Sequence, residues 1–331
     1  MTALTPQYSI SVVLAVYQGA DAVRKTVNSI INQACGSADA SNCVLELDIV
    51  IVDDGADHSC KNVLSDLMSN NECINVITQD NQGLTKALIV GCEAARFDLI
   101  ARIDVGDEML PGRLVRQAEY LDSHQGVGVV ASWTHIVTEE GDKLYDVSDS
   151  NDIVQRTLSL DELESARAPQ HYTTMFNKEL YQKVGGYRSQ FYFAQDMDLW
   201  LRLYEVADVV VMEDYLTSSV FSANAISGTY NKQQDELMHL AMQSAKLRRA
   251  GKSDETVLLQ AEQIRPMKMA GTDGQFNTLY FIAKCLLPHK PDSARRYFWR
   301  ALGKKPMSIK AGFGLLQAYW RAKIKTVEKK H

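Results

Sequence analysis

The sequence predicts an α/β fold in which a mostly parallel sheet is flanked by helices and followed by a helical C-terminal region. Short apolar runs alternate with helix-type segments over about the first hundred residues, a pattern typical of parallel strands joined by helical crossovers. Acidic residues follow two of these runs, at Asp53 and at Asp104, and open α/β sheets bind their ligands at the carboxyl ends of such strands. From about residue 233 the pattern is helical to the end.

The first hundred residues divide into four expected strands and three expected helices. Apolar runs predict strands over residues 10–16, 45–52, 75–77 and 98–103. The expected helices cover residues 21–33, 58–69 and 83–95. The first of these helices has Asp21 as a candidate N-cap, and Val23, Val27 and Ile30 lie on one face.

The pattern becomes less regular after residue 110. We expect helices over residues 111–123 and 195–205, strands over 128–133, 173–177 and 208–212, and a polar, turn-rich stretch over 138–150. We place a domain boundary near residue 230, so that residues 1–230 form the α/β domain and residues 231–331 form a basic helical region.

Composition indicates an ordinary globular protein. Of 331 residues, 46% are hydrophobic and 23% are charged. No apolar stretch approaches the length of a membrane-spanning helix, and the start lacks the basic and apolar regions of a secretory signal. We therefore expect a cytoplasmic protein, and the six cysteines, which have no Cys-x-x-Cys spacing, are expected to be reduced thiols rather than zinc ligands.

The C-terminal region is strongly basic although the whole chain has a net charge of −6. Residues 284–331 hold thirteen Lys or Arg but only Asp292 and Glu328 as acids, together with Trp299 and Trp320 among other aromatics. This combination suits docking on an anionic membrane surface, which would make the protein peripheral at the inner face of a membrane. The alternative is that the aromatic residues pack the core of a small helical domain. No nucleic acid is expected as a partner, since no recognition motif accompanies the charge.

Six motifs occur in a characteristic order. They are residues 11–19 (SVVLAVYQG), 50–55 (VIVDDG), 81–88 (NQGLTKAL), 100–114 (IARIDVGD followed by LPGRL), 185–187 (GGY) and 195–202 (QDMDLWLR). In these motifs, residues 8–230 resemble a family 2 glycosyltransferase with the GT-A fold, a Rossmann-like fold of nucleotide-diphospho-sugar transferases. The resemblance implies an inverting enzyme that uses a nucleotide sugar, and the missing Gln-x-x-Arg-Trp signature favours a non-processive one.

The resemblance assigns the donor nucleotide to Ala15, Tyr17, Asp54, Lys86 and Asp104. Asp54 would accept hydrogen bonds from the base, and Tyr17 would border it. Lys86 begins a helix after a glycine, and a helix N-terminus favours phosphate. The simpler interpretations are a turn at Asp54 and a solvated surface lysine at position 86.

The same resemblance implies a divalent metal, Mn²⁺ or Mg²⁺, held by Asp104 and Asp107. Family members usually have Asp-x-Asp-Asp, whose second Asp binds the metal, whereas this chain has Gly106 there. Either Asp107 takes over as ligand or metal dependence is weak. Relatives often supply a metal-binding His from a late loop, where this chain has Ser222, Asn224 and Ser227.

Asp196 matches the family's general base, which removes the proton of the acceptor hydroxyl opposite the leaving group. The alternative role for Asp196 is an N-cap, and Asp198 is expected to be a cap or an ion-pair partner. On the acceptor side we place His171, Gly185, Gly186 and Tyr187, with a structural hydrogen bond as the alternative for His171.

The resemblance implies transfer of one sugar from a nucleotide donor, UDP-linked, to a saccharide or lipid-linked saccharide in polysaccharide biosynthesis, whereas the residue chemistry by itself supports nucleotide binding and acid-base work. Two alternatives remain at this point. One is a catalytically degenerate scaffold that binds a nucleotide or a membrane. The other is a sugar-phosphate nucleotidyltransferase, although residues 16–20 lack the glycine-rich signature with Arg and Lys that such an enzyme needs.

Overall fold

The computed structural model describes residues 8–34, 45–148, 168–221, 231–266 and 272–328. Contacts divide the chain into two compact units. The first comprises Met1–Thr134, Ser148–Ser218 and Gln233–Arg265, and the second comprises His135–Val147, Ser219–Lys232 and Pro266–His331. Residues 233–265 thus group with the α/β unit, while the domain boundary near residue 230 stays a prediction.

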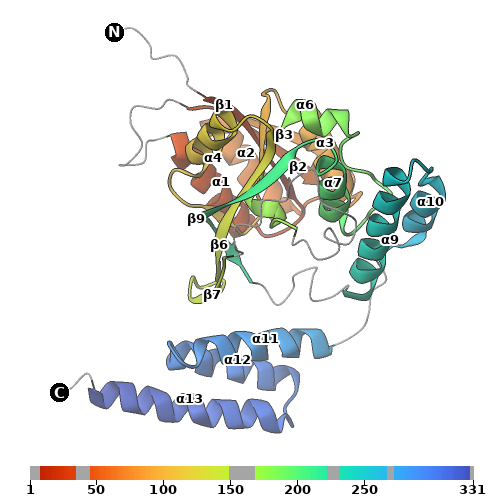
Figure 1. Ribbon diagram of the computed structural model, residues 1–331. Coiled ribbons are helices and arrows are strands. Elements are labelled where there is room, and N and C mark those ends of the chain that lie inside the picture. Colours follow the sequence, from red (N-terminus) through yellow and green to blue (C-terminus); the bar gives the residue numbers. More distant parts are fainter. Residues whose placement is uncertain (1–7, 35–44, 149–167, 222–230, 267–271, 329–331) are drawn as a thin grey trace, which may run out of the picture. The chain divides into compact units, whose positions relative to one another are not determined.

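A parallel block forms the first half of the sheet (Figure 1). Its strands, in the order β3-β2-β1-β4, are β3 (Ile74–Gln79), β2 (Leu45–Asp54), β1 (Tyr8–Val16) and β4 (Leu99–Arg102). The helices that follow the first three strands in sequence are α1 (Ala20–Ala34), α2 (His58–Asn70) and α3 (Leu84–Ala94). Apolar residues of β1 and β2, such as Val12, Leu14, Ile49 and Ile51, are fully buried, which explains their continuous apolar runs.

The other half of the sheet is antiparallel where its pairings are defined. From β4 the order continues through β8 (Met175–Asn177), β6 (Val127–Val137), β9 (Asp208–Val220) and β5 (Glu108–Met109), and β7 (Lys143–Val147) pairs with β6. The remaining helical segments of the first unit are α4 (Arg113–Ser123), η1 (His171–Thr173), α6 (Lys178–Lys183), α7 (Gln195–Leu203), α9 (Asn231–Arg249) and α10 (Glu255–Gln263).

Three helices dominate the second unit: α11 (Thr272–Leu286), α12 (Pro291–Lys304) and α13 (Ile309–Glu328). They share a core with Ile136 and Leu144, in which Tyr297 and Phe298 of α12 are buried. Among the described residues, no helix is both long enough and apolar enough to cross a bilayer.

The α/β prediction is confirmed, and the errors lie in short or polar elements. The stretch 138–150 was expected to be turns, yet it contains β7, in which only Leu144 is buried. Pairing with β6, which the sequence does not reveal, makes this segment a strand. The strand expected over 208–212 extends to Val220 because its later residues pair with β5. The short elements β5 and α6 were not predicted.

Candidate active site

The carboxyl ends of β1, β2 and β4 meet at one edge of the sheet. In the parallel register Val16 lies opposite Asp53, and Val13 lies opposite Arg102. Ala15 is therefore near the end of β1, Asp54 ends β2, and Asp104 follows β4 by two residues. The sheet thus brings three of the predicted donor residues to the edge where parallel sheets bind ligands.

Asp54 holds the loop that precedes α3. Its Oδ1 accepts hydrogen bonds from Gln79 Nε2 (2.7 Å) and the Gln82 amide (2.8 Å), and its Oδ2 accepts one from the Gly83 amide (2.9 Å). Gly83 has φ +89°, and a Cβ there would lie 2.6 Å from the Tyr192 ring. The loop therefore requires glycine at 83 and depends on the buried carboxylate of Asp54.

Two further residues predicted on the donor side are open to solvent. The Tyr17 side chain is 55% exposed just after β1. Lys86 is exposed in the first turn of α3, and its Nζ lies 3.4 Å from Gln82 Oε1. By contrast, Asp53 is buried and accepts a hydrogen bond from the Ala56 amide (2.7 Å), so it supports the turn after β2.

Asp104 is ordered by a buried arginine. The Arg102 guanidinium is 1% exposed, forms an ion pair with Asp104 and donates to the Ile103 carbonyl. Arg113, itself buried, donates to the Arg102 carbonyl at 2.8 Å. The Asp104 side chain remains 42% exposed, so it is fixed in orientation yet accessible to a ligand.

Asp107 differs from Asp104 in its surroundings. It is 4% exposed, its amide donates to the Asp104 carbonyl (3.1 Å), and its own carbonyl accepts from the Thr26 hydroxyl (2.8 Å). Burial lowers the pKa of Arg113 to about 9, while the charge of Asp107 acts in the opposite direction. The Asp107 carboxylate is thus a buried counter-charge for Arg113.

Asp104 and Asp107 are the candidate ligands for a divalent cation. Within the described parts of the chain, no three His, Cys, Asp or Glu side chains are grouped so that they could hold a metal ion. Asp104 offers one accessible carboxylate. Mg²⁺ is commonly bound by one or two carboxylates together with substrate phosphates, so the residues fit an ion shared with a donor diphosphate rather than a site built from protein alone.

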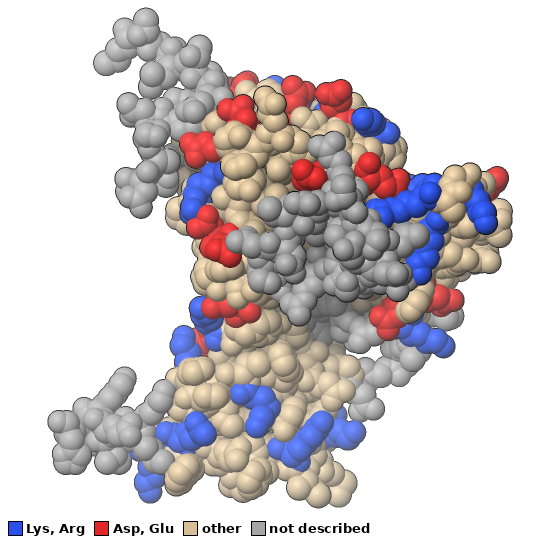
Figure 2. All heavy atoms as spheres, viewed as in Figure 1, with Lys and Arg blue, Asp and Glu red and all other residues tan. Residues whose placement is uncertain are grey.

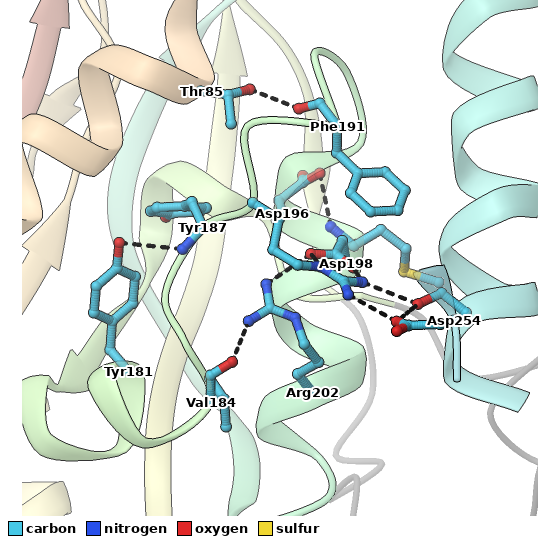
Figure 3. A network of polar contacts seen from close by, with 12 residues as sticks. Thr85, Tyr181, Val184, Tyr187, Phe191, Asp196, Asp198, Arg202 and Asp254 are labelled. Carbon is cyan, nitrogen blue, oxygen red and sulfur yellow. Dashed lines mark hydrogen bonds and ion pairs between the residues drawn. The ribbon is translucent and has the colours of Figure 1, made fainter. Parts of the chain in front are cut away.

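Asp196 lies at the start of α7 (Figure 3). Its side chain is partly exposed, and its Oδ1 accepts a hydrogen bond from the Met197 amide (2.9 Å). The helix begins after Ala194, which has φ +56° and is the one described non-glycine residue with positive φ. Such strained backbone persists where the surroundings fix it, and it is concentrated at functional sites.

His171, in the short helix η1, is a buried imidazole. Burial lowers its pKa to about 4, the charge of Arg102 acts in the same direction, and Asp196 and Asp104 oppose it. Burial therefore keeps the ring neutral at pH 7. Its Nε2 is hydrogen-bonded to the Tyr187 hydroxyl at 2.6 Å.

The Gly185–Gly186 pair shapes the segment that carries Tyr187. Both glycines have positive φ, and a Cβ on Gly186 would lie 2.8 Å from Tyr181. The Tyr187 amide donates to the Tyr181 hydroxyl at 3.2 Å, and burial holds the pKa of the Tyr187 phenol well above its usual value. This segment is therefore a tightly packed wall beside His171.

Sequence analysis missed the ion-pair network that secures α7 (Figure 3). Asp198 is fully buried and pairs with Arg202 (2.6 Å) and with Arg188, whose Nε lies 3.0 Å from Asp198 Oδ2. Arg188 also binds Asp254, next to α10, at 2.8 Å. The role of Asp198 as an ion-pair partner is confirmed, but no local pattern pointed to Asp254. The late-loop positions Ser222, Asn224 and Ser227 lie outside the described residues.

Comparison with known proteins gives consistent results. The model of the family described as "Glycosyl transferase family 2" matches residues 11–185, more than half of the chain. The amylovoran biosynthesis glycosyltransferase AmsE of Erwinia amylovora is 29% identical over 159 residues, which cover 47% of this chain and 57% of that protein. The match thus spans little more than half the length of that relative.

Two solved structures share the fold. The S. aureus protein TarS 1-349, solved in complex with UDP, superposes with a TM-score of 0.55 at 14% identity, covering 95% of this chain and 91% of the other. The mannosyltransferase PcManGT from Pyrobaculum calidifontis, in complex with GDP-Man and Mn²⁺, superposes with a TM-score of 0.53 at 14% identity, covering 97% and 88%. The likeness shows a shared GT-A fold.

Proposed function

This chain belongs to glycosyl transferase family 2, and we propose that it is an inverting, non-processive enzyme that moves one sugar from a UDP-linked donor to a saccharide or lipid-linked saccharide. The observation that carries the proposal is the junction between two separate motifs, where the Thr85 hydroxyl, next to the loop held by Asp54, donates a hydrogen bond of 2.8 Å to the Phe191 carbonyl in the segment that leads to Asp196. The nucleotide side and the segment that carries the candidate base are thus held together, as single displacement requires.

The donor nucleotide would bind at the ends of β1 and β2. Tyr17 offers an exposed ring for the base. Asp54 accepts three hydrogen bonds from its own loop, and a carboxylate has about four acceptor positions, which leaves capacity for a base N–H. Lys86 and the N-terminus of α3 would attract the diphosphate. A UDP donor is supported by the UDP-bound neighbour.

A divalent cation, Mn²⁺ or Mg²⁺, would be held by Asp104 together with the donor phosphates, and it would neutralise charge on the departing diphosphate. Asp107 would act indirectly, through Arg113 and the backbone of the turn that presents Asp104. Of the two predicted metal ligands, Asp104 and Asp107, this assignment keeps only Asp104, whose side chain is accessible. The Mn²⁺ in PcManGT supports the choice of ion.

Asp196 would act as the general base. A partly exposed carboxylate at the start of α7 can accept a proton from an acceptor hydroxyl as its oxygen attacks the anomeric carbon. Attack from the face opposite the diphosphate inverts the configuration. His171, Gly185, Gly186 and Tyr187 would form the acceptor-side wall, in which the buried His171 ring is fixed by its hydrogen bond to the Tyr187 hydroxyl.

The pathway we propose is polysaccharide biosynthesis, supported by the amylovoran enzyme among the relatives. A cytoplasmic location, predicted from the start of the chain, stays a prediction.

The test combines binding and turnover. Calorimetric titration with UDP and with GDP, each with and without Mn²⁺, should show UDP binding that Mn²⁺ strengthens. Asp196→Asn should keep that binding and lower UDP release from UDP-sugars by about a hundredfold or more. Asp122→Asn, which alters an exposed carboxylate on α4, should change neither quantity.

Binding of GDP in preference to UDP would overturn the donor assignment. Unchanged turnover in Asp196→Asn would overturn the base assignment.

A further inference from the structure

Helix α13 has apolar residues on two opposite sides. Ala311, Leu315 and Ala318 are buried in the core shared with α11 and α12. Four further apolar residues are exposed: Ile309 (88%), Phe313 (61%), Leu316 (68%) and Trp320 (65%). At 100° per residue these four fall within a narrow stripe opposite the buried side. We call this stripe the outer face of α13.

Exposed apolar side chains scattered singly are normal on protein surfaces, but a contiguous group indicates a binding surface. Met307, two residues before the start of α13, is also exposed, at 95%. A helix that is apolar on both sides is normally covered on both sides. The outer face therefore calls for a partner that takes apolar side chains.

The charge around the outer face identifies the kind of partner. Residues 284–323 contain ten Lys or Arg and one acid, Asp292. Figure 2 shows Lys and Arg side chains gathered over α11–α13 on the visible side. Lys310, Arg321 and Lys323 of α13 are all exposed. The partner must therefore combine apolar material with negative charge.

A shallow hollow of about 560 Å³ lies beside the outer face, between α12 and α13. Its lining includes Arg295, Leu316, Tyr319, Trp320 and Lys323, as well as the carboxylate of Asp292. The Arg295 guanidinium lies 5.0 Å from the centre of the Tyr319 ring. Cationic and aromatic groups side by side are typical of residues placed at the level of lipid headgroups.

We infer that the outer face of α13 docks on an anionic lipid bilayer. Phe313, Leu316 and Trp320 enter the boundary between headgroups and acyl chains, and Lys323 and Arg321 attract the lipid phosphates. A second copy of this chain is a poorer partner, because pairing two such faces would bring two strongly basic segments together. No residue of the candidate active site belongs to this surface, so the two assignments can fail separately.

The experiment is flotation of the full-length protein with vesicles of phosphatidylcholine, with and without about one third phosphatidylglycerol. We expect binding to the anionic vesicles that salt weakens. Phe313→Ser combined with Leu316→Ser should lower the partition coefficient at least about tenfold. Lys323→Ala should lower it about fivefold, because each basic residue near such a surface contributes to binding.

Two controls keep the result specific. Leu259→Ser removes an apolar side chain of α10 that is 58% exposed and lies in the other unit, and it should leave flotation unchanged. UDP binding and thermal unfolding of the double variant should match those of wild type, which excludes misfolding. Wild-type protein that stays with neither vesicle, or that binds neutral and anionic vesicles equally, would overturn the inference. So would lipid-free dimerisation that the double variant abolishes, since a second copy would then cover the face.

Discussion

The hydroxyl of Thr85 donates a hydrogen bond of 2.8 Å to the backbone carbonyl of Phe191. Thr85 belongs to the first turn of α3, directly after the loop held by Asp54, whereas Phe191 lies in the segment that leads into α7 (Figure 3). The same hydroxyl lies 3.2 Å from the Tyr192 carbonyl. The proposed donor side and the helix that carries Asp196 are therefore joined by one buried side chain.

Thr85→Val should weaken this junction without changing side-chain volume much. The Phe191 carbonyl would lose its donor in a buried place, which costs about 1–2 kcal/mol of unfolding free energy. Turnover should fall more than UDP affinity, because the position of the base relative to the donor would be less fixed. Urea denaturation and UDP release measure the two effects. Thr78→Val, at an exposed position of β3, is the control, and an equal loss in both variants would contradict the role of the junction.

Asp198→Asn should be among the most destabilising single changes in α7. The substitution removes the counter-charge of Arg188 and Arg202 in a buried place, and breaking a buried ion pair costs about 3–5 kcal/mol. Denaturant unfolding followed by circular dichroism gives the number.

The matched control for Asp198 is Asp66→Asn. Asp66 pairs with Arg24 at 2.7 Å, but these side chains are 51% and 45% exposed, so the loss should stay below about 1 kcal/mol. Similar losses in the two variants would mean that the network around α7 is not a buried anchor.

The sequence predicts features that depend on neighbouring residues, and it misses contacts between residues that are far apart in the chain. Asp54 and Asp104 were identified because each follows an apolar run in the sequence. Asp54 ends the strand that its run forms, and Asp104 lies two residues beyond its strand. The pairing of Arg102 with Asp104 joins residues only two positions apart, so it too lies within one local motif. Arg188 pairs with Asp254, which directly precedes α10 and is 66 residues away in the chain. No local pattern around either residue encodes that contact. The burial of Asp107, on which the choice of Asp104 as the metal ligand rests, is likewise a property of the folded chain that no local pattern encodes.

His171 should make stability fall with acid in a defined window. Burial lowers its pKa in the folded protein to about 4 from an ordinary 6.5. Below about pH 6.5 the unfolded chain therefore binds a proton here that the native protein does not. The contribution of the neutral ring to the free energy of unfolding is fully present above this pH. About 3 kcal/mol of it is lost as the pH falls toward 4.

The comparison that isolates this histidine uses His171→Gln. Between pH 7 and pH 4, wild type should lose about 3 kcal/mol more unfolding free energy than the variant. Chemical denaturation at intervals of pH measures both curves. Parallel curves would show that His171 titrates alike in the folded and unfolded states, and they would contradict burial as the cause of its lowered pKa.

Glycine should be required at position 106 because of its backbone conformation, and not because a side chain would collide with its neighbours. It has φ +103°, and a Cβ built there would meet no atom within 4 Å. Its amide donates to Thr26 Oγ1 at 2.9 Å, which fixes the turn that leads from Asp104 to Asp107. Gly106→Ala should therefore cost about 1–2 kcal/mol through backbone strain alone.

At Gly303 the change to alanine should have the opposite effect on stability. A Cβ at Gly303 also meets no atom within 4 Å, but this residue lies in α12 without positive φ, so alanine should stabilise the protein by about 0.5–1 kcal/mol. Thermal unfolding of both variants therefore separates strain from crowding. Because a side chain at 106 is strained whatever its chemistry, the Asp of the usual family motif would carry the same cost in this turn. A stable Gly106→Ala would remove that physical reason for the glycine in the acidic motif.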